Sequence, residues 1–366
     1  MRVLHVASSP VTLNRFVRPM EHSALSDGVE FIYATNMQRS DGVDGRSIVH
    51  LDIGRREHAI TSWATLCRTV RSINGMGVDV VHVHTPSTAL SLLPILPKVA
   101  AKTVYISRGG LSEGSNWLIG AAWKAVDPMR WRSWDAVGVI NSSQQVGLGS
   151  RRSRNASAAL IPIGGVGVSR ESVDRAKDAI VVPKPARRGR SVSLVWVGRF
   201  DKGKRPADFI ELIRRLRSQN MRVEGTMVGG VTVGDRPQRG FDMEHAIDLG
   251  IEVTGWVNDP LPYMRRADFL IHTSAREGYG MTPIEAALVG TPTIAYATSG
   301  TMESVPAVYG WLAGAGNLDQ MTDLCRRAMA SDYVVWSDRV MEAAWSLSDV
   351  DVWKAYLSLY DIAFSR

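Results

Sequence analysis

The feature that most limits how this chain can fold is a repeated alternation of short apolar runs with longer amphipathic segments. The apolar runs are rich in β-branched residues and nearly continuous, as in strands buried on both faces of a parallel sheet. The segments between them, such as 207–219, carry apolar residues three and four positions apart, which predicts helices. The expected strands are 1–8, 29–35, 79–85, 102–107 and 136–142, followed by 191–198, 223–230, 251–256, 268–274 and 291–297.

The two groups of strands predict two domains. Residues 181–191 between them are rich in proline and basic residues and are interpreted as a linker. We expect two doubly wound α/β domains, residues 1–180 and 192–347, which face each other across a cleft and bind ligands at the carboxyl ends of their strands. A final helix at 348–366 is expected to pack back on the first domain.

Composition limits the class of protein and its compartment. The chain is 45% hydrophobic and 22% charged, as in globular proteins. No run approaches the roughly 18 to 20 apolar residues that cross a bilayer, and the N-terminus lacks the apolar run of a signal peptide. The two cysteines, Cys67 and Cys325, lie far apart, which favours a reducing compartment. We expect a cytoplasmic protein, with peripheral attachment to the inner face of the cell membrane as an alternative.

Charge is divided unevenly along the chain. Residues 1–190 hold 25 basic and 14 acidic residues, a net charge of +11, whereas residues 191–366 hold 18 and 22, a net charge of −4. A basic first half indicates an anionic partner. Neither zinc-finger spacing nor an RNA-binding aromatic strand is present, so we expect no nucleic acid. Four tryptophans interleaved with cations fit an anionic membrane surface or helix packing: Trp117, Trp123, Trp131 and Trp134, with Lys124, Arg130 and Arg132.

Two glutamates flank a glycine-rich bend in the second half. Glu277 follows an apolar strand and directly precedes Gly278-Tyr279-Gly280, and Glu285 lies in the next helical run. The glycines allow backbone N–H groups and a helix N-terminus to approach an anion, normally a phosphate.

Glu285 also has a purely structural explanation. Thr282, Pro283 and Glu285 fit a capping box, in which threonine is the N-cap, proline the first helical residue and glutamate the third. Gly290 is then expected to end the helix. A capping box gives no reason for a carboxylate at Glu277.

This segment resembles the signature of the family 4 retaining glycosyltransferases, which have the two-domain GT-B fold. In that family a glutamate precedes Gly-aromatic-Gly, and a second glutamate follows eight residues after the first (E-x7-E). The matching residues are Glu277, Gly278, Tyr279, Gly280, Glu285, Ala286, Gly290 and Pro292. The resemblance implies that Glu277 binds the donor hexose and that Glu285 binds the ribose hydroxyls. It also implies that the backbone around Gly280, Met281 and Thr282 approaches the diphosphate.

A second pattern, at 195–206, resembles the start of the family's second domain. A strand is followed by Gly198, Arg199 and Lys204, as in the family's G-R-x4-K pattern. Cations placed here would stabilise the charge that develops on the leaving nucleoside diphosphate. The family usually has glycine after the lysine, whereas this chain has Arg205, so Lys202 is a second candidate for the phosphate-binding lysine. The structural alternative is a solvated basic turn.

The first half matches the family more loosely. Residues 79–86 resemble its D-V-V-H-x-H strand, and His82 and His84 share one face of that strand. Both histidines can be buried packing residues, or His84 can line the cleft. At 105–111, Arg108 stands where many members carry a histidine near the sugar, as in an Arg-Gly variant of some polysaccharide-assembling members. We expect Arg108 and His84 on the acceptor side.

The resemblance implies transfer of a hexose-type sugar from a nucleotide diphosphate sugar, with retention of configuration. We expect UDP-sugar rather than GDP-sugar as donor, a glycan or lipid-linked acceptor in surface polysaccharide synthesis, and neither cofactor nor metal. Asp349 and Asp351 have a metal-compatible spacing, but they precede the last expected helix and are assigned to capping. Two alternatives remain open: a nucleotide-sugar epimerase on the same fold, and a non-catalytic glycan- or nucleotide-binding subunit.

Overall fold

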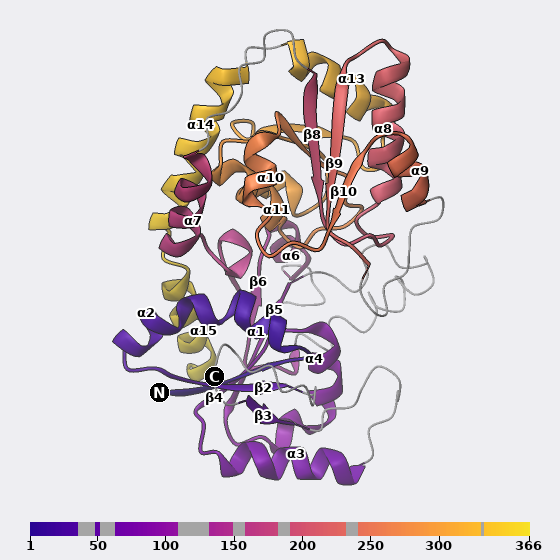
Figure 1. Cartoon of the computed structure of the whole chain (residues 1–366). Helices are drawn as coiled ribbons and strands as arrows, with labels where there is room; N and C mark the ends of the chain where they lie inside the picture. The colour runs from indigo at the N-terminus through magenta and orange to yellow at the C-terminus, as the bar shows by residue number, and fades with distance from the viewer. Residues whose placement is uncertain are drawn as a thin grey trace. The chain divides into compact units, whose positions relative to one another are not determined.

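The computed structural model describes residues 1–35, 48–51, 63–108, 132–148, 158–181, 191–231, 241–330 and 333–366 (Figure 1). The chain divides into two compact units, one of residues 1–167 and 351–366 and the other of residues 168–350. Each unit contains one sheet in which all described pairs are parallel, so the expected two-sheet α/β class is confirmed. Residues 182–190 of the expected linker lie outside the described residues.

The first unit has the strand order β3-β2-β1-β4-β5-β6-β7. Its strands are β1 (Arg2–Ala7), β2 (Glu30–Thr35), β3 (Ile48–His50), β4 (Val80–Val83), β5 (Lys102–Ser107), β6 (Ala136–Val139) and β7 (Ala158–Leu160). Its α-helices are α1 (Pro10–Phe16), α2 (Glu21–Ser26), α3 (Trp63–Gly75), α4 (Pro86–Leu92), α6 (Ser142–Leu148) and α15 (Val352–Phe364). Short 3-10 helices are η1 (Arg18–Met20), η2 (Leu93–Lys98) and η3 (Ile163–Gly165).

Helices cover both faces of this first sheet (Figure 1). Residues of α3 and α4 form one core with alternate residues of the central strands, including Leu4, Val6, Val81 and Val83. Helix α15 packs against β5, β6 and β7. Its N-cap is Asp351, whose Oδ1 accepts from the amide of Lys354 at 3.2 Å, which confirms the capping role expected for this aspartate.

The second unit has the strand order β10-β9-β8-β11-β12-β13. Its strands are β8 (Val192–Val197), β9 (Val223–Val228), β10 (Glu252–Gly255), β11 (Phe269–His272), β12 (Thr293–Tyr296) and β13 (Gly310–Ala313). Its helices are α7 (Arg170–Ile180), α8 (Pro206–Ser218), α9 (Met243–Asp248), α10 (Leu261–Arg266), α11 (Met281–Leu288), α12 (Thr301–Ser304), α13 (Leu318–Ala330), α14 (Tyr333–Trp345) and the 3-10 helix η4 (Ser346–Asp349).

Two groups of helices enclose the second sheet (Figure 1). Helices α8, α9 and α13 share a core with apolar residues of its strands, including Trp196, Phe269 and Ile294. Helix α11 contacts both α10 and α14, and α7 packs on α10. Helix α7 belongs to the second unit, although the first domain was expected to extend to residue 180.

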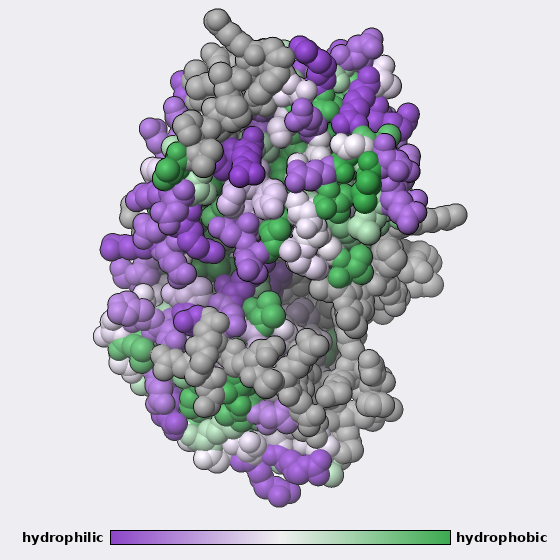
Figure 2. All heavy atoms as spheres, in the orientation of Figure 1, coloured by the Kyte–Doolittle hydropathy of each residue, from purple (hydrophilic) through white to green (hydrophobic). Residues whose placement is uncertain are grey.

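The visible surface is mostly hydrophilic and carries separate hydrophobic patches (Figure 2). This distribution is expected for amphipathic helices that turn their apolar sides to the sheets. None of the described helices has the length and apolar character that a membrane span requires.

Candidate active site

The strongest sequence patterns meet at the topological switch point of the second sheet, where the strand order reverses between β8 and β11. Strands β8 and β11 are hydrogen-bonded neighbours, and the strands that follow each in the chain lie on opposite sides of this pair. In doubly wound sheets, ligands bind at the carboxyl ends of two such strands. The loop after β8 carries Arg199 and Lys204, and the loop after β11 carries Glu277. The fold thus brings two distant patterns to one edge of the sheet.

Lys204 and Glu277 form an ion pair that joins these loops, with Lys204 Nζ on Glu277 Oε1. His272, the last residue of β11, is 2% exposed, and its Nε2 lies 2.9 Å from the same oxygen. Because a carboxylate only accepts hydrogen bonds, we assign the ring proton to Nε2. No donor among the described residues contacts Oε2, so this oxygen remains available to a ligand.

The environment keeps Glu277 ionised. Burial alone would raise the pKa of its carboxyl group, but the charge of Lys204 and the hydrogen bond from His272 outweigh burial and hold the pKa well below its usual range. A carboxylate with such a low pKa is a weak general base. Glu277 is therefore better suited to accept hydrogen bonds from ligand hydroxyls than to remove a proton.

Asp201 shapes the loop that carries the cations. Its Oδ1 accepts from the amides of Gly203 (2.7 Å) and Lys204 (2.9 Å), and its Oδ2 lies 3.0 Å from Arg199 Nη2. The Arg199 side chain is 52% exposed and Lys202 is exposed, whereas the Lys204 side chain is 23% exposed. Of the two candidate lysines, Lys204 is the one that contacts Glu277 in the loop after β11.

The backbone of Arg205 explains why glycine usually follows this lysine. Its φ of 54° and ψ of 56° lie in the left-handed region, which costs a non-glycine residue about 1–2 kcal/mol. The side chain offsets part of this strain, since its Nη2 lies 2.9 Å from Asp208 Oδ2 and its guanidinium lies 5.5 Å from the Tyr296 ring centroid. Thr273 Oγ1 lies within hydrogen-bonding distance of the carbonyls of Lys204 (2.8 Å) and Arg205 (2.9 Å). The end of β11 therefore holds the turn that presents Lys204.

We expect Arg205→Ala to lower the free energy of unfolding more than Arg205→Gly. Both variants lose the contacts with Asp208 and Tyr296, but only glycine removes the left-handed strain of about 1 kcal/mol or more. Urea unfolding midpoints measure the difference. Equal destabilisation by the two substitutions would show that the turn is not strained at this residue.

Helix α11 begins earlier than the capping box requires, so that interpretation is wrong. Its first residue is Met281, and its N-cap is Gly280, with a φ of 92° and no side-chain cap. Thr282 is the second helical residue, and Glu285 lies in the second turn. Glu285 therefore does not cap this helix and is half-buried. The expected end is confirmed, because Gly290 follows the C-cap with a φ of 71°.

Two glycines let the loop after β11 lie close to helix α12. A Cβ on Gly280 would lie 2.7 Å from Ser304 Oγ, and a Cβ on Gly300 would lie 2.7 Å from the Glu277 carbonyl oxygen. Burial and nearby Glu303 raise the pKa of Tyr279, which precedes Gly280, to about 12, so its hydroxyl stays protonated. Side chains at either glycine would push the loop and helix apart.

The loop after β11 leads directly into the N-terminus of α11. The first N–H groups of an α-helix, here those of Met281 and Thr282, have no acceptor within the helix. They and the helix dipole favour an anion such as a phosphate. The carboxylate of Glu277 and the amides of α11 thus follow one another along one short loop.

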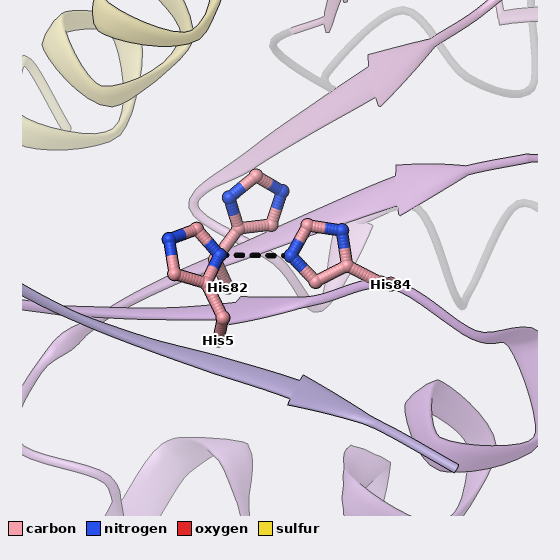
Figure 3. Close-up of side chains that lie close together, drawn as sticks. All are labelled: His5, His82 and His84. Carbon is pink, nitrogen blue, oxygen red and sulfur yellow. Dashed lines mark hydrogen bonds between the residues drawn. The ribbon is translucent and has the colours of Figure 1, made fainter. Parts of the chain in front are cut away.

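In the first unit, His84 belongs to a buried cluster with His5 and His82 (Figure 3). His5 on β1 is in register with His82 on β4, and His5 Nδ1 lies 2.9 Å from His84 Nε2. His82 Nδ1 lies 2.8 Å from the Tyr360 hydroxyl of α15. All three imidazoles are at most 1% exposed, which supports the packing alternative considered for His82 and His84.

The three imidazoles are neutral at pH 7. Burial, followed by nearby positive charge that includes Arg108, lowers the pKa of all three, and that of His5 to about 3. Their ligand nitrogens lie within 4.8 Å of one another, a spacing that could suit a metal ion. Three histidines can bind zinc without a carboxylate, but the Arg108 charge opposes a cation at this cluster. Neutral packing fits this cluster better than metal binding.

Arg108 is held within the first unit. Its Nη1 donates to the Gly164 carbonyl at 2.8 Å, and its Nη2 donates to the Gly165 carbonyl (3.2 Å) and the Tyr356 hydroxyl (2.8 Å). Its guanidinium lies 4.3 Å from the Phe16 ring centroid. These contacts tie β5 to η3 and α15, and the acceptor role of Arg108 stays a prediction.

The tryptophan group expected at a membrane surface is only partly described. Trp134 is 2% exposed and packs on Tyr105 with ring centroids 5.6 Å apart, so for this residue the interfacial role is wrong and the packing alternative holds. Trp117, Trp123 and Trp131 lie outside the described residues.

Part of the chain matches a known protein family. Residues 191–331, which contain both loops, match the family described as Glycosyl transferases group 1. No curated protein matches the sequence. Solved structures, in contrast, match over the whole chain.

Three solved structures illustrate the likeness. Sucrose-phosphate synthase from Thermosynechococcus elongatus has a TM-score of 0.73 at 18% identity, covering 100% of this chain and 97% of its own. HepE from Anabaena in complex with UDP has a TM-score of 0.71 at 15% identity, covering 100% of both chains. WaaG, a glycosyltransferase involved in lipopolysaccharide biosynthesis, has a TM-score of 0.67 at 15% identity, covering 99% of both chains. These likenesses show the GT-B fold, and together with the group 1 match they support a GT-B glycosyltransferase.

Proposed function

We propose that this protein is a retaining glycosyltransferase that moves a hexose-type sugar from a nucleotide diphosphate sugar to a glycan or lipid-linked acceptor. The observation that carries the proposal is the Lys204–Glu277 pair next to the start of α11. This pair lies at the topological switch point of the sheet, within the residues that match the group 1 family. It joins a cation, a carboxylate with one free oxygen and an anion-binding helix start.

The sugar, the diphosphate and the ribose of a nucleotide sugar each have a matching group in this proposal. Oε2 of Glu277 accepts a hydroxyl of the donor sugar, and the amides of Met281 and Thr282 approach the diphosphate. Lys204 and Arg199 neutralise the charge on the diphosphate, a role that we assign to protein cations rather than to a metal ion. Glu285, which is not needed as a cap, accepts the ribose hydroxyls.

The proposed reaction follows from this distribution of charge. The bond between the anomeric carbon and the phosphate oxygen breaks, and a bond forms from that carbon to the acceptor oxygen on the same face. The acceptor's proton passes to the leaving phosphate, so no protein base is required. Lys204 and Arg199 stabilise the developing phosphate charge. The low pKa of Glu277 agrees with a binding role rather than a basic one.

UDP-sugars are the donors that we propose first. HepE has been solved with UDP, with UDP and glucose, and with UDP-glucose, and WaaB is described as a lipopolysaccharide outer core galactosyltransferase. Transfer assays with a panel of UDP- and GDP-sugars test the proposal directly. Release of an epimerised free nucleotide sugar, or binding without any turnover, would instead support the two alternatives.

We expect Glu285→Ala to weaken the binding of a nucleoside diphosphate by about 10- to 100-fold, the usual loss of a hydrogen bond to a charged group. The loss should not come from a missing helix cap, because Glu285 caps no helix. Calorimetric titration with UDP and GDP measures the affinity. Glu244→Ala, an exposed acidic residue of α9, serves as the control. A lowered melting temperature with full affinity would assign Glu285 a structural role.

A further inference from the structure

His272 is a buried titratable group of the second unit that the proposed reaction does not use. It ends β11, is 2% exposed, and its one described hydrogen bond runs from Nε2 to Glu277 Oε1 at 2.9 Å. This position lies outside the E-x7-E and G-R-x4-K patterns. Its side chain nevertheless contacts the carboxylate that carries the proposed sugar-binding oxygen.

Two donors from different loops fix one oxygen of Glu277. Lys204 approaches Oε1 from the loop after β8, and His272 approaches it from the end of β11. The Lys204 chain is flexible and its charge is required by the diphosphate, whereas the imidazole has two torsions and is packed in the sheet edge. In a complex in which Lys204 Nζ turned toward a phosphate, His272 would be the described donor that still holds Oε1.

We propose that His272 is a positioning residue that fixes the Glu277 carboxylate so that Oε2 faces the donor sugar while Lys204 serves the diphosphate. The inference rests on the proposed function. It separates the two tasks of the site: nucleotide recognition depends on α11 and Glu285, and sugar recognition depends on the orientation of Glu277.

Substitution of His272 should therefore affect the sugar and not the nucleotide. His272→Leu removes the donor, and we expect about a 10- to 100-fold loss in affinity and in kcat/KM for the nucleotide sugar. The affinity for the free nucleoside diphosphate should be unchanged. His272→Gln, whose amide can reach the same oxygen, should restore most of the loss.

A double-mutant cycle tests whether His272 acts through Glu277. In a Glu277→Gln background, His272→Leu should cause no further loss, because the oriented carboxylate is already absent. Ile294→Ala, a buried change on the neighbouring strand β12, is the matched structural control and should lower stability without separating the two ligands.

The outcomes distinguish this inference from the function on which it rests. A loss in His272→Leu that is equal for both ligands, or that persists in the Glu277→Gln background, would overturn the positioning role. A wild-type protein that binds neither ligand would overturn the proposed function. Even then, the melting temperatures of His272→Leu, Glu277→Gln and the double variant measure the coupling between His272 and Glu277. Additive shifts would contradict this coupling, and non-additive shifts would support it.

Discussion

Replacing Lys204 with alanine should lower the turnover number about 10²- to 10³-fold, the usual loss when one preorganised charge-stabilising group is removed. The reason is its place at the site, where it is the partly buried cation that joins the two loops. Lys202→Ala should lose much less, because Lys202 is exposed. Single-turnover rates for the two variants compare the candidate lysines.

The same substitution should also destabilise the second unit. Without Lys204, Glu277 keeps only His272 as a partner, and burial then raises the pKa of its carboxyl group. Breaking such a pair from one side costs about 3–5 kcal/mol. Adding Glu277→Gln should recover much of the stability but none of the activity. Recovery of both, or a Lys204→Ala enzyme with wild-type rates, would contradict the assignment.

Acidification should destabilise the first unit through its three buried histidines. The folded-state pKa values of His5, His82 and His84 lie below the unfolded value of 6.5, so below pH 6.5 the unfolded chain binds more protons than the folded one. The stability that these groups confer is complete above pH 6.5 and is lost as the pH falls through 6.5 toward 3. At pH 5 the loss from His5, whose folded-state pKa is about 3, is about 2 kcal/mol, from 1.36 kcal/mol per pKa unit, and His82 and His84 add to it.

A loss of this size is a substantial share of the whole stability of many domains. Urea unfolding of the intact chain between pH 8 and pH 5 measures it. His5→Phe, which keeps a ring beside Phe31, should reduce the slope of unfolding free energy against pH by about one proton. Val81→Ala, a buried change on the same sheet, should lower stability without changing the slope. Equal stability at both pH values would show that the histidines are not buried as described.

The sequence by itself determined the class of fold and pointed to the main members of the candidate site. Apolar runs and helical spacing are local signals, and they located ten of the strands within a few residues. Strands β3, β7 and β13 were missed because the first two have three residues each and β13 begins with glycine. The glycines around Glu277 and the cations after β8 pointed to a candidate phosphate site, because the conformational freedom of glycine and the charge of a side chain can be recognised from the residue type alone.

Only the tertiary structure decided how these residues are used. The start of α11 depends on the left-handed conformation of Gly280 against α12, so the capping box in the sequence was misleading. His272 gave one weak signal in the sequence, as a polar residue that ends an apolar strand five positions before Glu277. Its contact with Glu277 depends on the conformation of the loop between them. His5 joins His82 through strand register, and Lys204 meets Glu277 across 73 residues. Such pairings arise from the order and register of strands, which local composition does not encode.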